Sequence, residues 1–388
     1  MAEYELVATC LFGLEGLLGG EIDALGLKRT GTIDGRVAFL GSETDIARAN
    51  INLRTAERVF IRLGEFKAET FDELFEGVKA LPWESFIGKT DVFPVKGHSI
   101  KSRLASIPDC QSIVKKAVAD RLASKYGVSW LEETGTKYQI EFFILKDMAS
   151  LMIDTSGIAL HKRGYRPRAG VAPLRETLAA AMVMISRPRE GVLIWDPFCG
   201  SGTIAIEAAL QLRRIAPGIE RSFAGEEFAF IPKGIWTRAR EEAQSFEVPA
   251  PGCLAWASDI DPEMLELAEA NARRAGVLEN IRIIQADART IKKPDCRGSI
   301  VSNPPYGERM SDITEAERLY RDIGKNFAGF SPWHIYILSA SENFERLYGR
   351  RADKVRKLYN GMIPCRLYQY FRPKDKNGTR AGNIPEME

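Results

Sequence analysis

The sequence predicts an α/β protein in which a parallel sheet ending in an antiparallel hairpin follows a smaller α+β region. From about residue 175 onward, apolar strand-like runs alternate with helix-like segments, which is typical of a parallel sheet. Near the C-terminus, residues 355–359 and 363–371 are rich in β-prone side chains and flank Asn360-Gly361, a strong hairpin signal. Before residue 155, short strands and helices follow one another without that strict order.

The size and composition are those of an ordinary globular protein. At about 150 residues per domain, 388 residues indicate two or three domains. A hydrophobic content of 45% and a charged content of 27% exclude wholesale disorder and fibrous repeats. No run approaches the ~18 apolar residues of a membrane span, and we expect no secretion signal at the N-terminus. The six cysteines form no CxxC pair and only three histidines are present, so we expect no metal site, no disulfide scaffold and a cytoplasmic location.

The N-terminal region is predicted to contain two α+β modules. In the first, strand-like or hairpin-like residues 4–10, 32–40 and 58–66 alternate with helix-like residues 14–25 and 44–50. In the second, we expect helices near 71–78 and over 111–126, and strands over 91–95, 138–146 and 149–155. This order fits a pair of small sandwiches of helices on a sheet.

The C-terminal region is predicted to be one doubly wound domain. Its expected strands cover 191–195, 254–257, 281–285, 298–301 and 333–338, followed by the hairpin. Helices are expected over 202–214 and after Asp261-Pro262, where proline suits the first helical turn. Residues 215–250 are interpreted as a helical insertion between the first two strands.

The near-neutral net charge of +2 conceals two basic stretches. Residues 101–175 carry 13 basic and 7 acidic side chains, and residues 346–380 carry 11 and 2. The first stretch ends in the segment HKRGYRPR at 161–168, where cations alternate with Tyr, Gly and Pro. Such segments suit phosphate contacts and base stacking, although a solvated linker has the same composition. We therefore expect a nucleic-acid partner whose binding weakens with salt.

Four motifs follow successive predicted strands. DPFCGSGT at 196–203 follows the first strand and opens a helix, so its glycines and free N–H groups suit a bound ligand. Asp259 and Asp287 follow the next two strands, where carboxylates could accept from ribose hydroxyls and from an adenine amine. NPPYG at 303–307 follows the fourth. Because ligands of open α/β sheets bind beyond the carboxyl ends of the strands, the four motifs predict one site.

This combination resembles the class I S-adenosylmethionine-dependent methyltransferases that modify exocyclic amines. Nearly the whole chain is similar to the THUMP-containing RNA guanine-N2 methyltransferases of the bacterial large-subunit (23S) rRNA type. The similarity includes the linker HKRGYRPRAG, the segment APLRETLAAAMV and the stretch FPVKGHS at 93–99. It implies a Rossmann-like class I methyltransferase sheet preceded by an α+β ferredoxin-like/THUMP RNA-binding region.

The resemblance also implies a domain plan. Residues 1–64 would form a ferredoxin-like domain, 65–155 a THUMP domain, 156–174 a basic linker and 175–388 the methyltransferase domain. One departure is the spacing from Asp196 to Asp259, which exceeds the ~20 residues usual in such folds and leaves the geometry of the 215–250 insertion open.

The resemblance further implies a role for each matched residue. Residues that would bind S-adenosylmethionine are Pro173, Leu174, Thr177, Asp196, Pro197, Phe198, Cys199, Gly200, Ser201, Gly202, Thr203, Asp259, Ile260, Asp287, Ala288 and Asn303. Asn303, Pro304, Pro305 and Tyr306 would receive the target base. Candidate RNA contacts are Lys96, Lys101, Lys162, Arg163, Tyr165, Arg166 and Arg168.

An exocyclic amine is a poor nucleophile because its lone pair is delocalised into the ring. The Asn303 side-chain oxygen and the Pro304 carbonyl could accept its two hydrogens and free that lone pair, while Tyr306 stacks on the base. A duplex would hide the amine, so the target base is expected in a loop or flipped out. Cys199 could be interpreted as a nucleophile for pyrimidine methylation, but inside the glycine-rich loop we expect a packing residue.

Several alternatives stay open at this point. The RNA could be rRNA or tRNA, and the same Asn-Pro-Pro-Tyr chemistry serves adenine-N6 and protein glutamine methyltransferases. The protein could also be an RNA-binding assembly factor without activity, which intact Asn303 and Tyr306 disfavour. Neither the target nucleotide nor the oligomeric state follows from the sequence.

Overall fold

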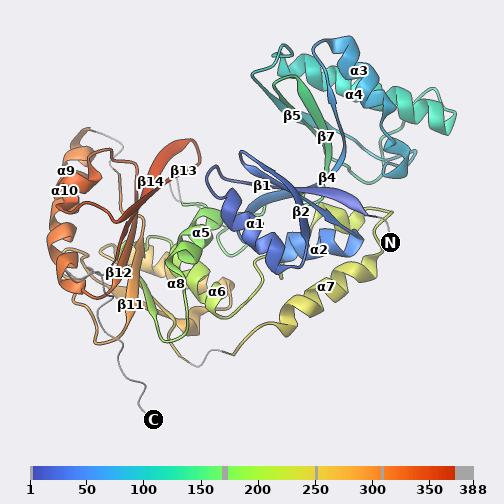
Figure 1. Cartoon of the computed structure of the whole chain (residues 1–388). Helices are drawn as coiled ribbons and strands as arrows, with labels where there is room; N and C mark the ends of the chain where they lie inside the picture. Colours follow the sequence, from blue (N-terminus) through green and yellow to red (C-terminus); the bar gives the residue numbers. More distant parts are fainter. Residues whose placement is uncertain (1–2, 168–173, 250–251, 307–309, 372–388) are drawn as a thin grey trace. The chain divides into compact units, whose positions relative to one another are not determined.

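A computed structural model describes residues 3–167, 174–249, 252–306 and 310–371, with the side chains of 310–312 excepted (Figure 1). The chain divides into two compact units. Unit 1 comprises Met1–Gly164 and Arg214–Val248, and unit 2 comprises Tyr165–Arg213 and Pro249–Glu388.

Unit 1 is built on one seven-stranded sheet with the order β2-β3-β1-β4-β7-β6-β5. Its strands are β1 (Tyr4–Cys10), β2 (Lys28–Ile33), β3 (Arg36–Gly41), β4 (Ala56–Lys67), β5 (Val95–Ile100), β6 (Ile140–Leu145) and β7 (Met148–Asp154). Only β5 and β6 pair in parallel. β4 pairs with β1 on one side and with β7 on the other, so the predicted boundary at residue 64 falls inside a strand. The two predicted N-terminal modules therefore share a sheet.

The helices of unit 1 are α1 (Glu15–Ala24), α2 (Glu43–Asn52), α3 (Phe71–Ala80), α4 (Ile107–Tyr126) and α7 (Lys233–Ser245). A capping box starts α3, since Thr70 and Glu73 each accept the other's backbone N–H. Gly127, with φ +63°, ends α4 in the left-handed conformation. Of the strand expected over 91–95, Val92 forms an isolated parallel bridge with Lys137, and the continuous strand begins at Val95. The Asp91 carboxylate closes the preceding turn by accepting from Gly88 N at 2.7 Å.

The segment 214–248 packs with unit 1, although in the chain it lies between two strands of the unit 2 sheet. Its helix α7 packs on α2, and Gly218 N donates to Ile51 O at 2.9 Å. Phe228 stacks on Tyr138 with the ring centroids 4.3 Å apart. Apolar side chains need a core to pack against, and the sequence does not reveal which of two cores receives them.

Unit 2 contains a second seven-stranded sheet with the order β10-β9-β8-β11-β12-β14-β13. The strands are β8 (Leu193–Asp196), β9 (Ala255–Asp259), β10 (Ile281–Gln285), β11 (Gly298–Ser302), β12 (His334–Ser339), β13 (Lys354–Asn360) and β14 (Ile363–Tyr370). The first five are parallel, and β13 and β14 form an antiparallel hairpin whose β14 pairs with β12. The predicted fold class is confirmed.

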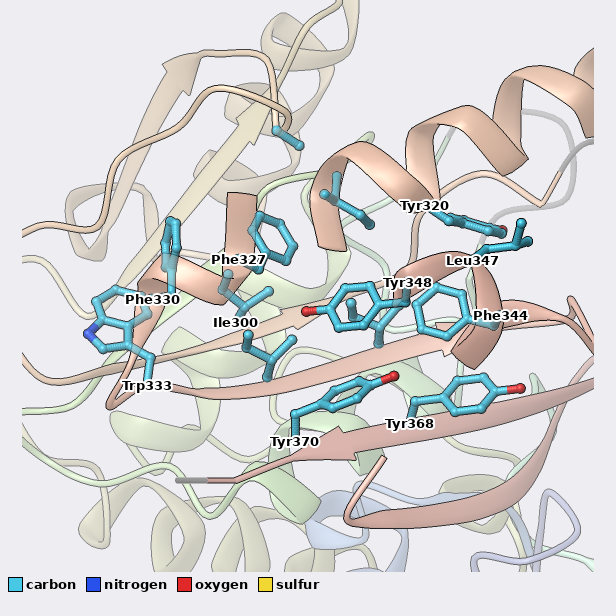
Figure 2. Close-up of a cluster of buried hydrophobic side chains, with 14 of the residues drawn as sticks. Ile300, Tyr320, Phe327, Phe330, Trp333, Phe344, Leu347, Tyr348, Tyr368 and Tyr370 are labelled. Carbon is cyan, nitrogen blue, oxygen red and sulfur yellow. The ribbon is translucent and has the colours of Figure 1, made fainter. Parts of the chain in front are cut away.

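Aromatic side chains anchor the hairpin of unit 2 (Figure 2). The helices of this unit are α5 (Glu176–Ser186), α6 (Thr203–Leu212), α8 (Pro262–Arg274), α9 (Met310–Phe327) and α10 (Phe344–Tyr348). Phe344 and Tyr348 of α10 lie over Tyr368 and Tyr370 of β14, with centroids 4.7 Å apart in each facing pair. Such aromatic contacts contribute beyond the area they bury, so they fix β14 beside β12.

Within the described residue ranges, no helix is both long and apolar enough to cross a membrane. The same ranges contain no group of three or more His, Cys, Asp or Glu side chains that could hold a metal ion.

A buried amide joins α2 to the end of β7 and supplies a test of unit 1. Asn50 Nδ2 donates to Thr155 Oγ1 at 2.9 Å, and Ser156 Oγ donates to Asn50 Oδ1 at 2.6 Å. Asn50→Ala would leave both hydroxyls without this partner in a dry site, so we expect the free energy of unfolding to fall by about 2–4 kcal/mol in urea titrations. The matched Asn52→Ala, half-buried on the same helix, should cost less than about 1 kcal/mol. Equal losses would contradict this account.

Candidate functional site

The glycine-rich loop lies between β8 and α6, at the carboxyl edge of the unit 2 sheet. Gly200 and Gly202 have φ values of +47° and +81°, a region that favours glycine, and Gly202 caps α6. A side chain at Gly200 would meet nothing within 4 Å, so the loop offers open space there. Cys199 N donates to Ser258 O at 2.9 Å, which ties the loop to β9.

Asp196 ends β8 and lies beneath this loop, 2% exposed. Its carboxylate accepts from Ser302 Oγ at 2.6 Å and from Phe198 N at 3.1 Å. Burial raises the pKa of Asp196 to about 7, and nearby Asp259 acts in the same direction. Because Ser302 immediately precedes Asn303, this hydrogen bond joins the glycine-rich loop to the NPPY segment.

Asp259 ends β9 and holds the loop from the other side. One of its oxygens accepts from Gly200 N at 2.9 Å and the other from Asp261 N at 3.1 Å. A carboxylate offers about four lone-pair sites, so two remain for a ligand. The next residue, Ile260, is 59% exposed, which is unusual for isoleucine and leaves an apolar surface beside the carboxylate.

Asp287 and Ala288 follow β10 and are less available to a ligand than Asp259. Arg289 donates to both oxygens of Asp287, with a closest approach of 2.5 Å, and this pairing lowers the pKa of the carboxyl. Ala288 is buried, and its carbonyl accepts from Asn326 Nδ2 at 3.0 Å. A ligand bound at this edge of the sheet would find the Asp287 carboxylate already paired with Arg289.

The NPPY segment follows β11 directly. Tyr306 donates its hydroxyl hydrogen to the side-chain oxygen of Asn303, and Cys365 Sγ of β14 lies 3.9 Å from that hydroxyl. Burial raises the pKa of Tyr306, so the hydroxyl stays protonated and acts as a donor. Tyr320 Oη donates to Pro305 O at 2.8 Å and fixes the backbone of the segment. Pro304 is buried and Pro305 is exposed.

The thiol of Cys199 is a packing group in this site. The residue is 6% exposed, and burial raises the pKa of the thiol well above its ordinary value. A thiol held in that form is a poor nucleophile. The expectation that Cys199 packs within the loop therefore fits its surroundings better than the covalent alternative.

The basic linker requires a correction. Arg163 is 7% exposed and donates to Leu160 O and Arg54 O, while Tyr165 is 5% exposed and its hydroxyl donates to Glu207 Oε1 at 3.1 Å. Arg166 pairs with Glu176 at 2.9 Å, and its donors also reach Leu174 O and Thr203 Oγ1 at 3.0 Å. These three side chains face the protein's own core, so the sequence was wrong to offer them to RNA.

The remaining candidates divide by exposure. Lys96, Lys101 and Lys162 are exposed, as RNA contacts must be. Leu174 and Thr177 are 6% and 0% exposed. Pro173 and Arg168 lie outside the described residues. On the hairpin, the basic residues Lys354 and Lys357 are exposed.

Sequence reasoning missed the residues that hold the motifs together. Besides Ser302, the fully buried Asn271 of α8 donates to Ser201 O at 3.0 Å and supports the glycine-rich loop. Only the position of Ser302, next to the NPPY segment, could have drawn attention to it. Asn271 acts across the fold, and no local pattern marks it.

Three family models match the chain in succession. Residues 163–369 match the RMKL-like methyltransferase domain, residues 5–60 the RlmL ferredoxin-like domain and residues 68–154 the THUMP domain. The chain is also similar to YpsC of Bacillus subtilis (strain 168), named as a proposed RNA methyltransferase, with 44% identity over 389 residues that cover 98% of this chain and 100% of YpsC.

Solved structures agree with these matches over almost the full length. A possible methylase from Clostridium difficile 630 is 42% identical, with a TM-score of 0.93 and coverage of 96% of this chain and 99% of that one. SMU.472, a proposed methyltransferase complexed with SAH, is 40% identical, with a TM-score of 0.90 and coverage of 97% and 100%. A predicted N6-adenine-specific DNA methylase from Listeria monocytogenes str. 4b F2365 is 45% identical, with a TM-score of 0.90 and coverage of 96% and 97%.

The position of Arg166 generates a prediction that separates a structural role from an RNA contact. Removing one partner of a buried ion pair leaves an uncompensated charge, so Arg166→Met should lower the free energy of unfolding by about 3 kcal/mol. The neighbouring exposed Lys162→Met should change stability by less than about 0.5 kcal/mol. Thermal unfolding of both variants, beside their RNA affinities, checks this. An Arg166 variant with full stability and weakened RNA binding would restore the sequence-based interpretation.

Proposed function

The chain belongs to the RMKL-like methyltransferase family, and from this premise we propose that it methylates the exocyclic N2 amine of a guanosine in RNA. Its methyl donor is S-adenosylmethionine, the cofactor of this family, and a 40% identical relative was solved with SAH. Its substrate is RNA, in keeping with the THUMP domain and with the RNA methyltransferase named among its relatives. The base, the atom and the class of RNA are the proposed part.

The assignment of an amine as the methyl acceptor rests on the NPPY segment, which the 2.6 Å hydrogen bond from Ser302 to Asp196 holds beside the glycine-rich loop. This hydrogen bond joins the end of β11, where Asn303 begins the NPPY segment, to the loop expected to hold the methyl donor. Parallel strands β8 and β11 are direct neighbours in the sheet, so the acceptors for an amine and the donor site share one edge. Holding both reactants in such a geometry supplies much of a transfer rate.

The residues present fit S-adenosylmethionine. Exposed Ile260 offers an apolar surface for an adenine ring, and Asp259 keeps free lone pairs for ribose hydroxyls. The open space at Gly200 and the ionisable Asp196 beneath the loop suit the methionine part. When bound, the cofactor supplies an electrophilic methyl group on its sulfonium.

The chain's own groups prepare the amine. We assign the side-chain oxygen of Asn303 and the carbonyl of Pro304 to accept the two amine hydrogens, which favours a nitrogen with a free lone pair. Proline restricts the backbone and holds these acceptors in advance, so their contribution is electrostatic preorganisation. No general base is needed, because the methylated nitrogen readily loses its extra proton.

Tyr306 would act through both its ring and its hydroxyl. The ring would stack on the extruded base. The hydroxyl donates to the side-chain oxygen of Asn303 and would be replaced there by the amine of the base. Since burial keeps the hydroxyl protonated, it can donate to Asn303 and release it without changing charge.

Two alternatives have a specific observation behind them. Adenine-N6 methylation is favoured by the description of the Listeria relative, whereas the THUMP domain favours RNA over DNA. Large-subunit rRNA is the class of RNA that the resemblance of the sequence implies, and tRNA is the second candidate because THUMP modules are compatible with both.

The proposed activity is tested by methyl transfer in vitro. Labelled S-adenosylmethionine is incubated with the full chain and deproteinised 23S rRNA, 16S rRNA or tRNA, and the digested nucleosides are separated. We expect label in N2-methylguanosine from 23S rRNA. Label in N6-methyladenosine would overturn the guanine assignment, and label from tRNA alone would overturn the rRNA assignment.

The acceptor role of Asn303 predicts a selective loss. Asn303→Ala should reduce kcat by a factor of about 10² to 10³, because a preorganised partner of the reacting group is lost, while the Kd for S-adenosylmethionine changes little. Tyr306→Phe, which keeps the ring, should retain kcat within about threefold, and Tyr306→Ala should lose a factor of about 10 or more. Single-turnover kinetics and calorimetry separate the two quantities. Full activity in Asn303→Ala would refute the mechanism.

The pKa of Asp196 predicts a pH dependence of cofactor binding. With a pKa of about 7, Asp196 gains negative charge as the pH rises from 6 to 7.5, and the charged form attracts the ammonium of the methionine part. The Kd for S-adenosylmethionine should therefore fall across this range, by up to about tenfold. Asp196→Asn should bind more weakly and show no such dependence. If the variant retains the wild-type pH profile, Asp196 is not the titrating group.

A further inference from the structure

A cavity of about 310 Å³ opens on one face of the unit 1 sheet. Val7 of β1, Ala38 of β3, Phe143 of β6 and Met152 of β7 form its apolar floor. The alternate residues Val37 and Phe39 of β3 are fully buried on the opposite face. Small-molecule sites begin at about this size and are mostly apolar with a few polar groups.

Arg36 lines the cavity and lies against the Phe143 ring of its apolar floor. Its guanidinium carbon lies 3.2 Å from the centroid of the Phe143 ring. Within the described chain, no acceptor pairs with this guanidinium, and Glu141 influences it without forming an ion pair. Burial lowers the pKa of Arg36 to about 10, so the charge is held there at a cost. The guanidinium therefore keeps N–H donors that a ligand with acceptors could use.

Further cations line the same face. Exposed Lys146, in the turn between β6 and β7, borders the cavity, and its ammonium pairs with none of the described residues. Lys96 of β5 is exposed and lies opposite Glu141 in the parallel ladder. Arg62, by contrast, is already paired with Glu5 and Glu65. Arg36 and Lys146 are therefore the charges available to a ligand in the cavity.

Stacking, hydrogen bonding and charge together suit a nucleotide. A guanidinium that lies on one aromatic ring can take a base on its other face, as Arg planes do in single-stranded RNA recognition. Its edge can donate to base or phosphate oxygens, and a lysine at the rim suits a phosphate. An apolar peptide side chain would leave the donors of Arg36 unused.

We propose that this cavity binds one unpaired nucleotide of the RNA substrate, with the base on the Arg36–Phe143 stack and a phosphate beside Lys146. The nucleotide is distinct from the target base, which we assign to Asn303 and Tyr306 in unit 2. This proposal rests on RNA being the substrate of the proposed function. It gives unit 1 an anchoring site for RNA.

Filter binding of 23S rRNA fragments to the full chain tests the proposal. Arg36→Met should raise the Kd about tenfold, Arg36→Lys should raise it less, and Lys146→Met should raise it severalfold. Arg29→Met is the matched control, because it removes an exposed arginine of β2 outside the cavity, and it should change the Kd less than twofold. Thermal unfolding verifies that the variants fold. If the Arg36 variants do not fold, Lys146→Met still tests the proposal, because Lys146 is exposed.

A photocrosslink locates the contact independently. RNA that carries 4-thiouridine at unpaired positions should crosslink within β6 or β7, and Arg36→Met should abolish that product. Unchanged RNA affinity in the Arg36 and Lys146 variants, or crosslinks only elsewhere, would overturn the proposal. A different result would refute the proposed function, namely absence of N2-methylguanosine in the transfer assay. Even then, an increase in the Kd for RNA caused by Arg36→Met would support nucleotide binding in the cavity.

Discussion

The hydrogen bond between Ser302 and the buried carboxyl of Asp196 is the contact on which the rest of the site depends. It fixes the end of β11 against the end of β8, and so sets the NPPY segment beside the glycine-rich loop. Asp259 completes the arrangement from β9 by accepting from Gly200 N. Because all three strands are parallel, their carboxyl ends bring a donor site and an amine-binding segment to one edge. The chemistry proposed here needs little more than this alignment.

Much of the fold and the motifs could be predicted because the relevant signals are local. Asn360-Gly361 indicated the hairpin, and β13 and β14 end and begin beside it. The glycines of the loop have the positive φ values that their residue type favours. The alternation of strands and helices after residue 175 corresponds to a sheet with five parallel strands. Each of these inferences depended on residues close together in the chain.

What the sequence did not indicate depends on distant residues. The segment 215–250 lies within the match to the methyltransferase family, but nothing in it indicates contacts such as Gly218 with Ile51, which pack it into unit 1. Arg163 and Arg166 are basic residues of a linker, and charge alone suggested an RNA contact. Their partners, the Arg54 carbonyl and Glu176, are set by folding and leave no trace in the linker sequence. Likewise, nothing near Arg36 in the chain indicates the ring of Phe143 beneath it.

The most direct test of the central claim compares the RNA of cells with and without this protein. Mass spectrometry of nucleosides from purified 23S rRNA, 16S rRNA and tRNA would be carried out on the deletion strain and on strains complemented with the wild type or with Asn303→Ala. The account predicts loss of one N2-methylguanosine from 23S rRNA, restored by the wild type and not by the variant. Unchanged N2-methylguanosine together with loss of N6-methyladenosine, or restoration by Asn303→Ala, would contradict it.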